Sequence, residues 1–70
     1  MKLSVQIASV PDRDDAVAEL WQGDRMVGEL QCMEGDQFML EIYSNGRGIP
    51  WQINLDDMLA ALTEAKNRLS

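Results

Sequence analysis

Glutamates and aromatic residues alternate with leucines in three apolar segments, and this pattern predicts a surface that binds a charged partner. Alternate residues of a strand point to opposite faces of a sheet. If the leucines of these segments point inward, the opposite face carries carboxylates among aromatic and methionine side chains. Carboxylates favour a basic partner, and aromatic side chains anchor many interfaces. The candidate binding residues are Glu19, Trp21, Glu29, Glu41 and Tyr43.

The same face has a purely structural interpretation, in which the rings pack on cross-strand neighbours and the glutamates keep the sheet hydrated. The orientation of Trp21 depends on the hairpin register. A two-residue turn at Gly23-Asp24 pairs Trp21 with Met26 and Val17 with Leu30, which turns Trp21 toward the core. A three-residue loop or a bulge returns Trp21 to the glutamate face.

An acidic loop holds three carboxylates within four residues, at Asp12, Asp14 and Asp15. Oxygen clusters of this kind bind hard cations such as calcium. The loop lacks the glycine and the closing glutamate of an EF-hand, so an ordinary acidic turn without a metal is the favoured interpretation. As part of an acidic rim, Asp14 is a further candidate for contact with a basic partner.

The residue types of this chain give little support for catalysis. The chain has no histidine, which removes the commonest general base and the Ser-His-Asp and Cys-His systems. Its single cysteine, Cys32, lies in an apolar alternating segment and is expected to be a small buried side chain. Arg47, between two glycines, is expected in an ordinary turn. The sequence therefore predicts a protein that is not an enzyme and has no cofactor.

The charge balance limits the classes of partner. Six Lys and Arg against twelve Asp and Glu give a formal net charge of -6. This argues against direct binding of nucleic acid and against an anionic membrane surface, and favours a basic protein. An alternative is that the carboxylates imitate phosphates and block a nucleic-acid-binding enzyme. The lone cysteine and the lack of a signal peptide or a membrane-spanning run lead us to expect a cytoplasmic protein.

The elements that position these residues read as an antiparallel meander followed by one helix, in a single domain over residues 1–70. Period-two alternation and turn residues predict four strands, or five if Trp51 and Ile53 form a short one. The predicted strands cover residues 2–10, 16–22, 26–33 and 38–43. The fold class is therefore α+β, with the sheet packed on the C-terminal helix.

The predicted helix runs from Leu55 to Arg68 and follows an N-cap at Asn54. Leucines and other apolar residues at helical spacing, including Leu59 and Leu62, indicate the face that covers the sheet. Such a helix is about 21 Å long, enough to cross four strands spaced about 4.8 Å apart.

A chain of 70 residues buries only a small core, and one cysteine excludes an internal disulfide. Self-association is therefore a second interpretation. In a structural homodimer, Trp21, Met33 and Met39 would be contact residues.

The order of these segments resembles small bacterial proteins of the immunity-protein type. The resemblance is carried by Val17-Ala18-Glu19-Leu20-Trp21, a Gly-Asp turn, Val27-Gly28-Glu29-Leu30, Phe38-Met39-Leu40-Glu41-Ile42-Tyr43, and the segment from Trp51 to Leu62. It implies a strand meander closed by one helix, and a non-enzymatic inhibitor that binds a toxin or nuclease. It carries no residue roles with it.

Overall fold

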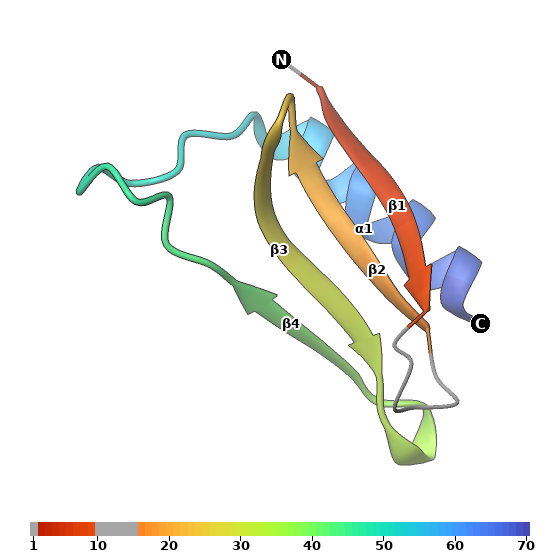
Figure 1. Ribbon diagram of the computed structural model, residues 1–70. Helices are drawn as coiled ribbons and strands as arrows, with labels where there is room; N and C mark the ends of the chain where they lie inside the picture. The colour runs from red at the N-terminus through yellow and green to blue at the C-terminus, as the bar shows by residue number, and fades with distance from the viewer. Residues whose placement is uncertain (1, 10–15) are drawn as a thin grey trace.

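The described residues fold into a four-stranded antiparallel sheet with the helix α1 on one face (Figure 1). The computed structural model describes residues 2–9 and 16–70. The strands lie in the sheet in chain order, β1-β2-β3-β4, which confirms the predicted meander and the α+β class. The elements are β1 (Leu3–Ser9), β2 (Ala16–Gln22), β3 (Arg25–Cys32), the short 3-10 helix η1 (Glu34–Asp36), β4 (Phe38–Ile42) and α1 (Leu55–Leu69). Within the described ranges, residues 51–54 form no fifth strand.

The hairpin between β2 and β3 combines the two alternatives that the sequence left open. Gly23, with φ of +65°, and Asp24 form a tight turn, and Trp21 pairs with Met26. A register shift between Leu20 and Trp21 then inserts one extra residue into β3, so that Glu19 pairs with Glu29. The bulge therefore leaves Trp21 on the glutamate face, where its indole bonds to Glu19.

The bulge also corrects one expectation of simple alternation. Strict alternation along β3 places Val27 on the same face as Glu29, but Val27 is fully buried and packs in the core with Leu20 and Leu30. The extra residue in β3 interrupts the period of two, so residues on either side of it no longer alternate regularly.

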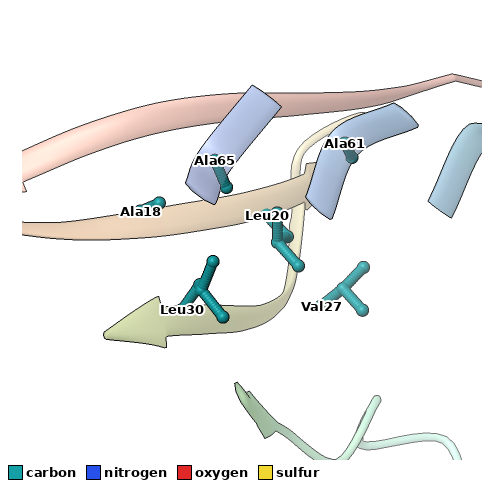
Figure 2. Close-up of a cluster of buried hydrophobic side chains, with 6 residues drawn as sticks. All are labelled: Ala18, Leu20, Val27, Leu30, Ala61 and Ala65. Carbon is teal, nitrogen blue, oxygen red and sulfur yellow. The ribbon is translucent and has the colours of Figure 1, made fainter. Parts of the chain in front are cut away.

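The core between sheet and helix is small and is built largely from short side chains (Figure 2). Leu20 and Val27 are its largest fully buried side chains. Because alanine has a short side chain, Ala61 and Ala65 of α1 let the helix approach the sheet closely. The buried cluster comprises Ala18, Leu20, Val27, Leu30, Ala61 and Ala65.

The start of α1 agrees with its sequence signals. The Asn54 side chain accepts a hydrogen bond of 3.1 Å from the backbone N–H of Asp57, as an N-cap residue does. Ile53 and Met58, on either side of this cap, both pack against the core cluster. These contacts fix the angle at which the helix meets the sheet.

The predicted sheet-facing side of the helix is wrong for Leu55 and Leu59, which stay exposed. The prediction holds for Ala65, which is buried, and for Leu62, which is half-buried and packs against the core. Ala61, which lies outside the predicted stripe, is also buried against the sheet. Close approach through the alanines turns the leucine stripe to one side. No helix in the described part of the chain is long and apolar enough to cross a membrane.

The helix also covers less of the sheet than its length allows. It packs on β1, β2 and β3, and Figure 1 shows it behind β1 and β2 with β4 lying to one side. Leu40 and Ile42 of β4 share the helix-facing side with Leu30, yet they remain exposed. The expectation that the helix covers all four strands is therefore wrong.

Candidate interaction surface

Three glutamates stand side by side across the face of the sheet that the helix does not cover. Glu19 of β2 pairs directly with Glu29 of β3, and Glu29 pairs directly with Glu41 of β4. Directly paired residues point to the same face, and their Cβ atoms lie about 4.5–5.5 Å apart. We call Glu19, Glu29 and Glu41 the carboxylate row, and the face that carries it the outer face.

Neutral donors, rather than cations, hold two members of the carboxylate row. The indole Nε1 of Trp21 donates to Glu19 over 3.2 Å, and the amide Nε2 of Gln31 donates to Glu29 over 2.9 Å. In the described part of the chain, the one ion pair is that of Arg68 with Glu64 on α1. The row is therefore hydrogen-bonded to neutral groups while its negative charge remains without a basic neighbour there.

Tyr43 completes the row at its β4 end. It lies two residues beyond Glu41, and its backbone N–H donates to the carbonyl of Val27. Partial burial and, after it, the neighbouring carboxylates of Glu41 and Glu29 together raise the pKa of Tyr43 from 10.0 to about 12. The hydroxyl therefore stays protonated beside the row at neutral pH.

Apolar side chains surround the row on the outer face. Val17 is buried and shares this face with Glu19, and the Trp21 ring is half-buried on it. Met39 pairs with Gln31 and is largely exposed. The outer face thus places the charged row among apolar side chains, of which Met39 is the most exposed.

The structure brings together five of the six residues predicted for the site, four of them in strands and Tyr43 directly after β4. The list is Glu19, Trp21, Glu29, Glu41 and Tyr43. The sixth candidate, Asp14, lies outside the described residues, as does the whole acidic loop at positions 12–15. Sequence reasoning missed the part played by Gln31. Its position two residues after Glu29 was the available signal.

The second tryptophan has a different place. Trp51 packs against the core cluster, and its Nε1 donates to the Tyr43 carbonyl over 2.7 Å. The Arg25 guanidinium stacks on the Trp51 ring, 5.3 Å from its centroid, and donates to the carbonyl of Asn45. These contacts attach the segment between β4 and α1 to the sheet. Trp51 therefore stabilises this loop and is not part of the outer face.

The other residue types considered for chemistry are the acidic clusters, the cysteine and the loop arginine. In residues 2–9 and 16–70, no group of three His, Cys, Asp or Glu side chains is placed to hold a metal ion. Cys32 is half-buried rather than fully buried, and it is free. Arg47 is exposed in its loop, where its N–H donates to the Asn45 side chain.

No family model, curated protein or solved structure matches this chain. The resemblance to immunity-type proteins therefore stays a prediction, and the roles of the outer-face residues rest on the geometry just described.

Proposed function

We propose that this protein is a non-enzymatic binding protein of the immunity or inhibitor type, which docks its outer face onto a basic surface of a target protein. The carboxylate row is the observation that supports the proposal. Glu19 and Glu41 flank Glu29 on neighbouring strands, and the described residues around them supply only neutral donors.

A row of this kind is costly in the free protein. Like charges placed directly opposite each other destabilise a sheet by roughly 0.2–1 kcal/mol per pair. A bound Lys or Arg side chain removes this repulsion and forms charge-assisted hydrogen bonds to the carboxylates. Relief of the repulsion between the glutamates therefore favours the complex. A basic partner supplies the positive charge that relieves it.

The aromatic residues have a different task in the complex. Trp21 donates a hydrogen bond to Glu19, and Tyr43 lies two residues beyond Glu41, so each ring stands beside a carboxylate of the row. Flat rings also accept an arginine side chain by stacking, with the guanidinium over the ring face. We therefore assign the apolar contact with the partner to the rings of Trp21 and Tyr43. The glutamates make the site selective for positive charge.

The test is a titration with an arginine- and lysine-rich peptide, followed by NMR shifts of the backbone amides. We expect the largest shifts at Glu19, Glu29 and Glu41 and at their outer-face neighbours. Replacement of both Glu19 and Glu41 by glutamine should weaken binding about tenfold or more, since two charge-assisted contacts are lost.

The matched control replaces Glu34 and Asp36 of η1 by Gln and Asn. Both side chains are exposed, and the change in net charge is the same. If the control weakens binding as much as the outer-face variant does, only net charge attracts the peptide, and the proposed site is wrong.

Imitation of nucleic acid is the alternative use of the same carboxylates. It predicts that DNA competes with this protein for its target, whereas a purely protein-directed inhibitor tolerates added DNA. Three carboxylates in one row form a short array for such imitation. A cytoplasmic location belongs to this proposal too, on the ground of the single cysteine.

A further inference from the structure

A second surface, on the other side of the sheet, is apolar and open. Leu40 and Ile42 of β4 are 42% and 49% exposed, and Leu55 and Leu59 of α1 are 69% and 53% exposed. We call these four residues the open apolar surface. A monomer rarely leaves so many large apolar side chains exposed near each other without a binding role.

The leucines of α1 form a seam with the spacing of a coiled coil. Leu55, Leu59, Leu62 and Lys66 follow each other at intervals of four, three and four residues. This is the alternation of the a and d positions of a heptad, and it forms a narrow stripe along one side of a helix. The stripe lies beside the Ala61 and Ala65 face that packs on the sheet.

Lys66 shows which way this seam points. Its Nζ lies 5.4 Å from the centroid of the Phe38 ring, at the start of β4. Phe38, Leu40 and Ile42 share one face of β4, because alternate strand residues point the same way. At Lys66 the seam therefore faces the side of β4, on the sheet face that also carries Leu40 and Ile42.

The charges at the ends of the seam are opposite. Asp56 lies in the first turn of α1, next to Leu55, and Lys66 lies in the last turns. In an antiparallel pair of α1 helices, Asp56 of each copy lies near Lys66 of the other copy. Leu59 of each copy then lies opposite Leu62 of the other. Parallel packing would instead place like charges together. A surface that complements itself in this way suits a twofold axis.

We propose that the open apolar surface joins two copies of this chain, with their α1 helices antiparallel and the seam at the centre of the contact. Leu40 and Ile42 flank the seam and lose exposure in the dimer. The carboxylate row lies on the opposite side of the sheet, so the two acidic outer faces point away from each other. The dimer then presents two separate acidic faces, and its formation does not rest on the proposed function.

The test is the solution mass by light scattering over a range of concentrations. We expect about twice 7.9 kDa for the natural chain and about 7.9 kDa for Leu59→Glu. Because Leu59 is exposed in the monomer, the variant should keep its helical circular dichroism. The matched control is Met39→Glu, an exposed methionine on the outer face, which should remain a dimer.

The orientation has its own test. Lys66→Glu alone and Asp56→Lys alone should each raise the dimer dissociation constant by about 3- to 10-fold, because each creates like-charge pairs between the helices. A mixture of the two variants should restore tight association. Parallel helices would leave the Lys66→Glu constant unchanged, which would overturn the antiparallel arrangement.

Three results would overturn the surface itself. The natural chain could be a monomer at all concentrations, Met39→Glu could dissociate the dimer while Leu59→Glu does not, or both variants could remain dimeric. Dissociation by Met39→Glu alone would assign the contact to the outer face. Two dimeric variants would assign it to pairing of strand edges.

Discussion

Glu19 and Glu29 stand directly opposite each other on neighbouring strands, and Glu41 extends the pair to a row. Evolution toward stability alone would separate or neutralise such charges. A row that is held by neutral donors and lacks a basic neighbour in the described residues is therefore a reason to look for a partner. The same row makes a sharp prediction about the stability of the free protein.

Replacement of Glu29 by glutamine should stabilise the free protein by about 0.2–1 kcal/mol, because the central charge of the row is removed. The amide oxygen of the new side chain can still accept the bond from Gln31. Urea denaturation measures the change. The exposed Glu34→Gln variant serves as a control and should differ little from the natural chain. A destabilised Glu29→Gln variant would show that the row holds the sheet together.

Tyr43, the single tyrosine, reports on the same row through its ionisation. Its pKa is raised from the ordinary 10.0 to about 12, so absorbance at high pH should show a late transition. Above pH 10 the unfolded chain loses this proton while the folded chain keeps it. The contribution of the Tyr43 proton to the free energy of unfolding is therefore fully present below pH 10, and it declines as the pH rises toward 12. Glu41→Gln should lower the pKa, and a normal value in the natural chain would contradict the contact.

Gly28 sits where β3 and β4 approach too closely for any side chain. A Cβ atom there would overlap the backbone oxygen of Glu41. Gly28→Ala should therefore cost more than about 1 kcal/mol and expose the amides of β4 to hydrogen exchange. Gly48→Ala is the control, since a Cβ there meets no atom within 4 Å, and only its φ of +70° adds strain. Unchanged protection of β4 in Gly28→Ala would contradict the close approach.

The helix cap gives a smaller effect. Asn54→Ala removes the acceptor for the Asp57 amide and should cost about 1 kcal/mol in thermal or urea unfolding. Asn67→Ala, an exposed position in the last turns of α1, should leave stability nearly unchanged. Equal effects of the two variants would show that the cap bond contributes nothing.

The structure and the sequence pattern differ on which core residue contributes most to stability. Leu20→Ala should cost about 2–5 kcal/mol, since Leu20 is fully buried. Leu62, which the helical pattern places at the centre of the sheet-facing side, is half-buried, so Leu62→Ala should cost less. A larger loss for Leu62 would mean that the helix packs on the sheet through its leucines.

Local patterns in the sequence were sufficient to predict the strands, the turns, the helix and its cap. Alternation in β2, β3 and β4 also predicted that Glu19, Glu29 and Glu41 share a face, because side-chain direction in a strand has a fixed period of two. Asn54 marked the start of α1 since an N-cap acts within one turn. These features depend on residues that are near each other in the chain.

The remaining features depend on contacts between segments that are distant in the chain. The bulge between Leu20 and Trp21 depends on how β2 meets β3, and it set both the outward Trp21 and the buried Val27. The choice of Ala61 over Leu59 as the sheet-facing residue depends on how closely the helix can approach, which an apolar pattern on one helix does not encode. Exposure of Leu40 follows from the position of α1 over β1, β2 and β3, a packing of distant segments that no local signal determines.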